Sequence, residues 1–171
     1  IGGSLGALSI NSAIKNGLTK IKESRVNLIW QTGLPYFNIA NQSVNELNSK
    51  NITVYPFIKE MDLAYNVADI VVSRAGAIAI SELCCIGKPT ILVPSPNVSE
   101  DHQYKNAQSL VNKNAAVLVK DIEANSKLVN KLIDLINDKK TQKKLSDNIK
   151  KLSKKDAANF IADITLNMIN K

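Results

Sequence analysis

A glycine-rich turn and one longer stretch carry the residue types best suited to ligand chemistry. The turn is GGSLGA at residues 2–7, and the stretch runs from Arg74 to Asn106. Glycines such as Gly3 and Gly6 let the backbone approach a ligand closely, and the helix that follows presents unpaired N–H groups and its positive dipole end. The turn therefore predicts a phosphate or diphosphate site, with the Ser4 hydroxyl as an added donor. It is neither a Walker loop nor a full G-x-G-x-x-G fingerprint.

A second turn, Arg74-Ala75-Gly76-Ala77, follows the apolar run Asp69–Ser73 and opens another helix. Gly76 and Ala77 would present the amides of that helix to the same crevice, at the carboxyl ends of neighbouring strands. Two anion-accepting helix ends at one sheet edge suit a diphosphate better than a single phosphate. The alternative interpretation is tight packing between strand and helix.

Glu82 stands five residues after Ala77, in a helix that is otherwise made of apolar residues. An acid in such a helix needs a partner or a use. A carboxylate has two accepting oxygens, which suits the two hydroxyls of a ribose. A surface glutamate or a structural salt bridge is the alternative.

The polar loop from Ser95 to Gln103 follows a predicted strand and precedes a predicted helix, so we expect it to lie over the same crevice. The side chains of His102 and Gln103 can donate and accept hydrogen bonds, which suits sugar hydroxyls. General-base chemistry by His102 and acid chemistry by Asp101 are the competing interpretations. We favour sugar binding or helix capping, with Asp101 as the cap.

Strands that alternate with helices predict one α/β domain with a parallel, doubly wound sheet and right-handed crossovers. No strand precedes the first glycine turn, so the sequence looks like a piece cut just before it. The expected strands are Val26–Trp30, Ile52–Phe57, Asp69–Ser73, Thr90–Val93 and Ala116–Val119. The expected helices are Ala7–Lys22, Tyr36–Ser49, Met61–Ala68, Ala77–Ile86, Gln103–Asn112, Asn125–Asn137, Thr141–Leu152 and Lys155–Asn170.

The composition of the 171 residues, 44% apolar and 22% charged, is typical of a soluble globular domain. No apolar run approaches the roughly 20 residues that span a bilayer. Cys84 and Cys85 are adjacent in an apolar helix, and we expect reduced core residues in a cytoplasmic protein. With His102 as the single histidine, we expect no metal site.

The net charge of +7 comes largely from a lysine-rich tail, which we place at residues 141–171. A solvated helix face is the simplest interpretation, and attraction to anionic lipid or to a phosphorylated substrate is the alternative. Nucleic acid is a poor candidate partner, because two arginines and few aromatic residues give no stacking platform.

Several motifs occur in one order along residues 1–107. They are GGSLGA at 2–7, WQTG at 30–33, Phe57-Ile58 with Met61, Ala68-Asp69 with Val71-Val72, RAGA at 74–77, Ser81-Glu82, GKP at 87–89, Val93-Pro94 and HQYKNA at 102–107. This order resembles the carboxyl-terminal domain of the MurG family, which are GT-B glycosyltransferases of family 28. Members of that family transfer N-acetylglucosamine from its UDP derivative to an undecaprenyl-pyrophosphoryl-N-acetylmuramyl-pentapeptide, a step of peptidoglycan synthesis.

The resemblance implies that residues 1–171 form a Rossmann-like lobe that holds most of the UDP-N-acetylglucosamine. Ser4 would contact the diphosphate, the backbone of Ile58 the uracil edge, and Gln103 the sugar hydroxyls. The helix end at the phosphates and ribose would be Ala77, Ile78, Ala79, Ile80, Ser81 and Glu82, with Glu82 on the ribose. The supporting residues would be Gly3, Gly6, Arg74, Gly76, His102 and Asn106.

Two positions depart from the pattern of the family, which often has glutamine at both. Leu5 leaves only its backbone to contact the diphosphate. His102 can still hydrogen-bond a sugar, although its contacts would differ from those of an amide.

The resemblance further implies an inverting, hexosyltransferase mechanism in which helix ends and amides stabilise the leaving UDP. No cofactor or metal is implied, and the sequence has no Asp-x-Asp pair. The acceptor site and the candidate base would belong to an amino-terminal domain, so we expect no catalytic residue in this sequence. We expect weak binding of UDP-N-acetylglucosamine without turnover, in an enzyme peripheral on the cytoplasmic face of the bacterial plasma membrane.

Three other functions remain open at this point. One is a lobe of another GT-B enzyme that acts on a lipid or N-glycan acceptor, including enzymes with one lobe per chain. Another is a non-catalytic nucleotide-sugar-binding module. The third is a UDP-sugar epimerase, which would need several acid and base residues near the sugar, where only Glu100, Asp101 and His102 are available.

Overall fold

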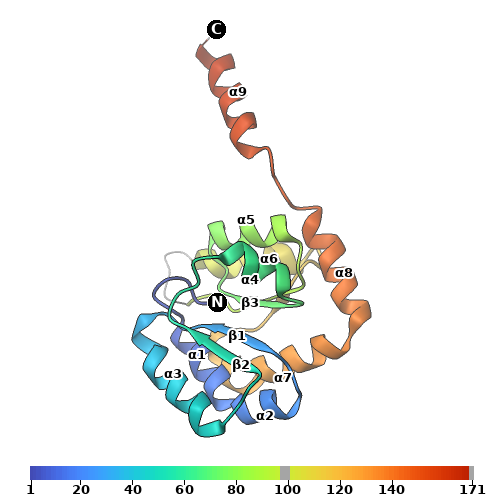
Figure 1. Cartoon of the computed structure of the whole chain (residues 1–171). Coiled ribbons are helices and arrows are strands. Elements are labelled where there is room, and N and C mark those ends of the chain that lie inside the picture. The colour runs from blue at the N-terminus through green and yellow to red at the C-terminus, as the bar shows by residue number, and fades with distance from the viewer. Residues whose placement is uncertain (97–100, 170–171) are drawn as a thin grey trace.

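The computed structural model describes residues 1–96 and 101–169, in which helices alternate with short strands (Figure 1). The strands are β1 (Leu28–Gln31), β2 (Ile52–Tyr55), β3 (Val71–Ser73), β4 (Thr90–Leu92) and β5 (Val117–Leu118). The helices are α1 (Leu8–Asn16), α2 (Leu18–Glu23), α3 (Leu34–Leu47), α4 (Met61–Val67), α5 (Ala77–Ile86), α6 (His102–Val111), α7 (Ala124–Asn137), α8 (Lys139–Lys150) and α9 (Ala157–Ile169). A 3₁₀ turn, η2 (Asp121–Glu123), precedes α7.

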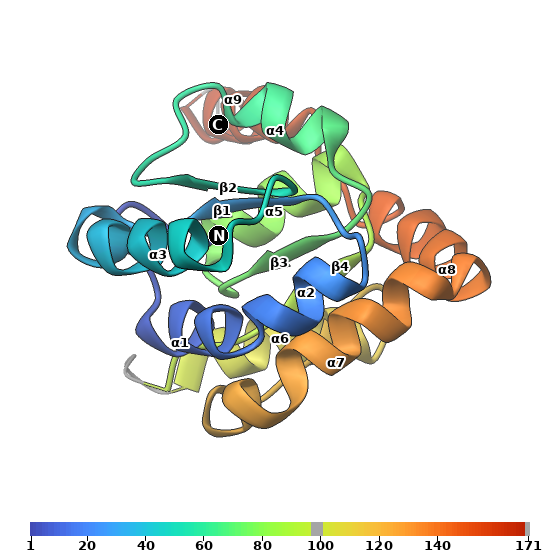
Figure 2. The same cartoon turned by 60° about the horizontal axis from the view of Figure 1, so that its bottom comes forward.

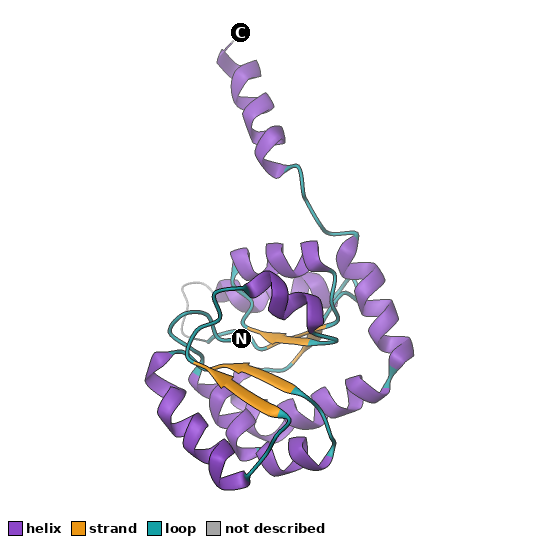
Figure 3. Cartoon of the chain, viewed as in Figure 1, coloured by secondary structure: helices purple, strands orange, loops and turns teal. Residues whose placement is uncertain are grey.

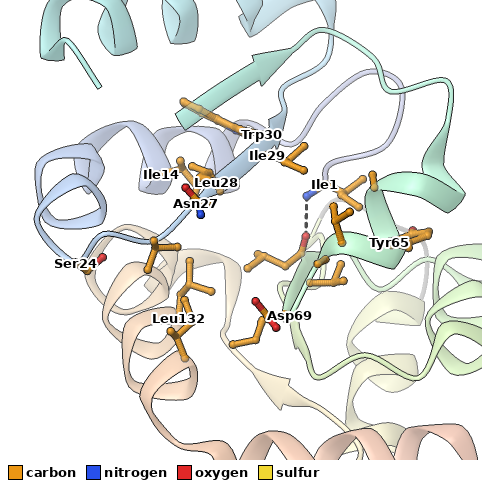
Figure 4. A pocket seen from close by; sticks show the side chains of 18 of the residues that line it. Ile1, Ile14, Ser24, Asn27, Leu28, Ile29, Trp30, Tyr65, Asp69 and Leu132 are labelled. Atoms are coloured by element: carbon orange, nitrogen blue, oxygen red, sulfur yellow. Dashed lines mark hydrogen bonds between the residues drawn. The ribbon is translucent and has the colours of Figure 1, made fainter. Parts of the chain in front are cut away.

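Every strand pair is parallel, which confirms the predicted α/β class. The strands form two sheets, with the order β1-β2 in one and β3-β4-β5 in the other (Figure 3). The predicted parallel sheet is therefore present as two separate groups of hydrogen-bonded strands in the described residues. Residues of β1 and β3 line opposite sides of a mostly apolar cavity of about 530 Å³ that lies between the two sheets (Figure 4).

The amino group of Ile1 lies in this cavity and donates a hydrogen bond to the carbonyl oxygen of Val72 at 2.6 Å, drawn as the dashed line in Figure 4. Burial, and next the charge of Arg74, lower the pKa of this amine from its ordinary 8.0 to about 5. Among the residues predicted to bind ligand, Ile58 alone lines the cavity. The cavity is therefore distinct from the predicted ligand site.

The predicted helices and strands lie within a few residues of those observed, with one break. The expected helix Ala7–Lys22 is divided into α1 and α2 at Gly17. A β-carbon on Gly17 would lie 2.5 Å from the side chain of Val129, so α7 packs directly against this backbone. The sequence around Gly17 carries no sign of this long-range contact.

Two apolar clusters form the core. One joins α1, β1 and α7 through side chains such as Ile14, Trp30 and Leu128, and α1 and α7 lie side by side in Figure 2. The other joins α5, α6 and α8 through Leu83, Leu110 and Ile149. Together they support the helices whose first turns face the predicted ligand site.

The cysteines are both free thiols, but they are not both core residues. Cys84 is buried in α5, whereas Cys85 is exposed and accepts a hydrogen bond from the hydroxyl of Ser153 at 3.3 Å. The prediction of two core cysteines is therefore wrong for Cys85, because successive helical positions face different sides.

The carboxyl-terminal part is helical, as predicted, and α9 projects away from the remaining elements (Figure 1). All described side chains of α9 are exposed, and so are the tail lysines from Lys139 to Lys155. Within residues 1–96 and 101–169, no helix is long and apolar enough to cross a membrane. The last expected helical residue, Asn170, lies outside the described residues.

Candidate functional site

The GGSLGA turn packs against the end of β1 and fixes the start of α1. The backbone of Gly3 and Gly6 is left-handed, with φ of 77° and 78°, and the Gly6 N–H donates to the Gly3 carbonyl at 3.1 Å. A β-carbon on Gly6 would lie 2.0 Å from the Thr32 carbonyl oxygen, so no larger residue fits there. Ser4 and Leu5 are exposed at the tip of this turn.

Asn11 of α1 holds this helix to the end of β1, a role that the sequence did not indicate. Its buried side-chain amide donates to the Thr32 carbonyl at 2.8 Å, and its side-chain oxygen accepts from the Trp30 indole at 3.0 Å. Asn11 therefore connects the helix that follows GGSLGA to the WQTG motif. Both motifs belong to one packed unit.

The first turns of α1 and α5 are the two predicted anion-accepting helix ends. Their first intrahelical hydrogen bonds run from Asn11 N to Ala7 O at 2.8 Å and from Ile80 N to Gly76 O at 2.9 Å. Neither helix has a capping side chain, and neither has an acid in its first turn. The earlier N–H groups of both helices lack helical acceptors, as an anion site requires.

The predicted phosphate segment of α5 is accessible. Ala77 and Ile78 are exposed, and a β-carbon on Gly76 would meet nothing within 4 Å. Ala79 and Ile80 are half-buried, and the Ser81 hydroxyl donates back to the Ala77 carbonyl at 3.0 Å. The open side of Gly76 leaves room for a ligand at the start of the helix.

Arg74 joins the two helix ends. Its guanidinium donates to the Ser9 hydroxyl of α1 at 3.1 Å and to the Val93 carbonyl after β4 at 3.0 Å. It also forms an ion pair with Asp121 of η2, and the Ser9 hydroxyl donates to the same carboxylate. These contacts bring the starts of α1 and α5 into one region, and they show Arg74 occupied by protein groups.

Gln103 links the second glycine turn to the loop after β4. Its side-chain oxygen accepts from the Ala75 N–H at 3.2 Å and from the Ser95 N–H at 2.9 Å. This leaves the amide NH₂ of Gln103 as the donating end. Asn106, one turn later, donates to the Ala75 carbonyl at 3.1 Å, so side chains of α6 bond both the N–H and the carbonyl of Ala75.

Glu82 is exposed on α5. We expected it to need a partner because its neighbours in the helix are apolar, and that expectation assumed burial that the structure does not show. The hydroxyl of Tyr65 on α4 approaches its carboxylate at 3.4 Å, a long hydrogen bond. Burial, and next the charge of Glu82, raise the pKa of Tyr65 to about 12. The carboxylate of Glu82 retains most of its accepting capacity.

Ile58 lies in the segment after β2, and its backbone N–H is already engaged. It donates to the side-chain oxygen of Gln31 at 3.0 Å, and the nitrogen of that amide donates to the Gly3 carbonyl at 3.1 Å. Any hydrogen bond from the backbone of Ile58 to a nucleotide base would therefore use its carbonyl oxygen. No sequence signal indicated that Gln31 would connect these two segments.

The predicted cap at Asp101 is wrong. Asp101 occupies the N-cap position of α6 with a φ of 58°, and its side chain makes no capping hydrogen bond. His102 is exposed at the first residue of α6. Of the loop that we expected over the crevice, Asn97 to Glu100 lie outside the described residues.

No set of three or more His, Cys, Asp or Glu side chains with the arrangement of a metal site occurs in the part of the chain that the structure describes. The groups at this site that could accept an anion are the backbone amides of the two helix ends and the Ser4 hydroxyl. These groups can neutralise phosphate charge through hydrogen bonds and helix dipoles.

The glycosyltransferase family 28 C-terminal domain profile matches residues 1–161. Curated relatives from Phocaeicola vulgatus and Porphyromonas gingivalis are 48% and 52% identical over 174 and 163 residues, covering 100% and 95% of this chain. Both relatives are named UDP-N-acetylglucosamine–N-acetylmuramyl-(pentapeptide) pyrophosphoryl-undecaprenol N-acetylglucosamine transferase. The chain spans only 46% and 43% of their lengths.

The fold is also similar to a solved structure. The crystal structure of MurG from Acinetobacter baumannii superimposes with a TM-score of 0.82, at 26% sequence identity. The match covers 96% of this chain and 47% of that chain.

Proposed function

We propose that this chain, which belongs to the glycosyltransferase family 28 C-terminal domain family, binds the nucleotide-sugar donor of an inverting N-acetylglucosamine transferase. The donor is UDP-N-acetylglucosamine. The acceptor is an undecaprenyl-pyrophosphoryl-N-acetylmuramyl-pentapeptide, so the reaction belongs to peptidoglycan synthesis. The names of the relatives support the substrates, and the geometry of the site supports the role of donor binding.

The observation that carries this proposal is the hydrogen bond between Arg74 and Ser9, which places two uncapped helix ends together. A diphosphate has two phosphoryl groups, and each helix end offers unpaired N–H groups to one of them. Ser4 lies at the tip of the first turn, and its hydroxyl is a further donor to the same diphosphate.

The remaining parts of the donor follow from this placement. Glu82, farther along α5, accepts hydrogen bonds from the ribose hydroxyls. The donating NH₂ of Gln103 binds hydroxyls of the N-acetylglucosamine, with Asn106 holding the same turn. Ile58 offers its backbone carbonyl to the uracil edge, and His102 contributes to the grip on the sugar.

The chemical role of these groups is to stabilise the leaving UDP. When the bond between the anomeric carbon and the diphosphate breaks, negative charge grows on the diphosphate oxygen. Preorganised amides and helix dipoles stabilise that charge more strongly than they stabilise the neutral bond. Activation of the acceptor hydroxyl falls to residues beyond this chain, which spans less than half of its relatives.

We further propose that residues 1–171 act as one lobe of a two-lobed enzyme that works at the cytoplasmic face of the bacterial plasma membrane. The lipid-linked acceptor requires a membrane surface. The exposed lysines of residues 139–155 would favour anionic lipid. Sedimentation with phosphatidylglycerol vesicles, and with neutral vesicles as the control, tests whether these lysines bind anionic lipid.

Isothermal calorimetry tests the donor assignment directly. The chain is titrated with UDP-N-acetylglucosamine, UDP-glucose and ADP. We expect UDP-N-acetylglucosamine to bind most tightly, because the sugar and the base both contribute contacts. Equal affinity for all three ligands, or no binding of any, would overturn the assignment.

A further inference from the structure

Gln31 is a buried glutamine whose two amide atoms hold two separate parts of the candidate site. It is the last residue of β1, and only 3% of its surface is exposed. Its nitrogen donates to the Gly3 carbonyl in the diphosphate turn at 3.1 Å, and its oxygen accepts from the Ile58 N–H at 3.0 Å. Among the residues that the structure describes, no other side chain forms hydrogen bonds to both segments.

The two bonds fix the orientation of the amide. If the amide were flipped, its NH₂ would face the Ile58 N–H and its oxygen would face the Gly3 carbonyl. Both contacts would then be repulsive, so one orientation is strongly preferred. A buried amide that is held in this way transmits a shift of one segment to the other.

The partners of Gln31 lie outside the regular strand ladder. Gly3 belongs to a left-handed turn, and Ile58 follows β2 in a segment without regular structure. The last ladder contact before Ile58 pairs Gln31 with Tyr55. After that pair, β1 and the segment that contains Ile58 are connected by the hydrogen bond of the Gln31 side chain.

We propose that Gln31 is a positioning residue that sets the spacing between the diphosphate end and the base end of the nucleotide site. This inference rests on the proposed function, in which GGSLGA binds the diphosphate and Ile58 the base. A ligand that engages both ends gains from this preset spacing, because the chain does not have to order the two segments on binding. A ligand that engages only the base gains much less.

The test variant is Gln31→Met, which keeps the length and burial of the side chain and removes both hydrogen bonds. We expect its Kd for UDP to rise about tenfold, the loss that accompanies one or two ordering hydrogen bonds. We expect its Kd for uridine to change less than about threefold. The preference for UDP over uridine therefore falls in the variant, and NMR titration measures both constants.

Gln142→Met is the matched control. Gln142 is also buried, 9% exposed, and its amide nitrogen donates to the Leu135 and Ile136 carbonyls, both at 2.8 Å, at the junction of α7 and α8. We expect this variant to lower the melting temperature as Gln31→Met does and to keep the wild-type preference for UDP over uridine. A merely structural role for Gln31 would make the two variants alike.

The outcomes separate this inference from the proposed function. If the wild-type chain binds no UDP, both are overturned. If it binds UDP and Gln31→Met keeps the wild-type preference, only the positioning role is overturned. Should Gln31→Met fail to fold, Gln31→Glu replaces it, because glutamate still accepts from Ile58 but cannot donate to Gly3. We expect that variant to lose preference for UDP as well, and an unchanged preference would contradict the proposal.

Discussion

The guanidinium of Arg74, in the turn after β3, donates to the hydroxyl of Ser9 in the first turn of α1 at 3.1 Å. The two residues are far apart in the sequence, yet each stands beside an uncapped helix end. Asp121 contacts both of them and completes the cluster. One arginine therefore connects the turn before α5 to the first turn of α1.

Replacing Arg74 by lysine keeps the charge and loses the planar fork that reaches Ser9, Val93 and Asp121 together. We expect the free energy of unfolding to fall by about 1–3 kcal/mol, because hydrogen bonds to charged, part-buried groups are lost. We expect the Kd for UDP to rise by about tenfold as the helix ends lose alignment. Urea unfolding and calorimetry measure the two effects.

Arg25→Lys provides the control for this substitution, since Arg25 is exposed and is not among the residues that contact Arg74. The free energy of unfolding and the Kd for UDP should both stay at the wild-type level in that variant. A normal Kd for UDP in Arg74→Lys would show that alignment of the helix ends does not depend on this cluster.

Gly6 and Gly3 offer a matched pair for the diphosphate turn, because both have a left-handed φ near 78°. A β-carbon on Gly6 would lie 2.0 Å from the Thr32 carbonyl oxygen, whereas one on Gly3 would meet nothing within 4 Å. We expect Gly3→Ala to cost about 1 kcal/mol, the strain of a left-handed alanine. Gly6→Ala should cost at least about 2 kcal/mol more, since Thr32 must move.

Chemical denaturation of the two alanine variants compares these costs directly. Equal losses would mean that the turn can shift away from Thr32 without penalty. That result would also weaken the argument that GGSLGA and WQTG form one rigid unit.

Local sequence signals predicted most elements of the fold. The apolar period and the Gly87-Lys88-Pro89 stop signal gave α5 its observed bounds, Ala77–Ile86. The break at Gly17 was missed because its cause is Val129, which reaches it only in the folded chain. The division of the sheet was missed for a similar reason, since strand patterns do not report which strands become neighbours.

The sequence predicted where the candidate site lies, but it did not predict the hydrogen bonds that join its segments. Glycine turns and the polar loop marked the ends of the strands, because backbone freedom and exposed polar side chains are visible in a sequence. The roles of Asn11, Gln31 and Asp121 were not visible, because each depends on a partner from a distant segment. The exposure of Glu82 also depends on packing that helical periodicity alone does not decide.

Glu82→Ala tests the predicted ribose contact. We expect the loss of a charged hydrogen bond to weaken UDP binding by about 1–3 kcal/mol. The comparison ligand is 2′-deoxy-UDP, which lacks one of the two hydroxyls. The wild-type chain should prefer UDP, and the variant should bind both ligands alike, as calorimetry will show.

Tyr65→Phe serves as the control for Glu82→Ala, because it removes only the long hydrogen bond to Glu82. The preference for UDP over 2′-deoxy-UDP should remain in that variant. If Glu82→Ala also kept the preference, the carboxylate would have no part in ribose binding.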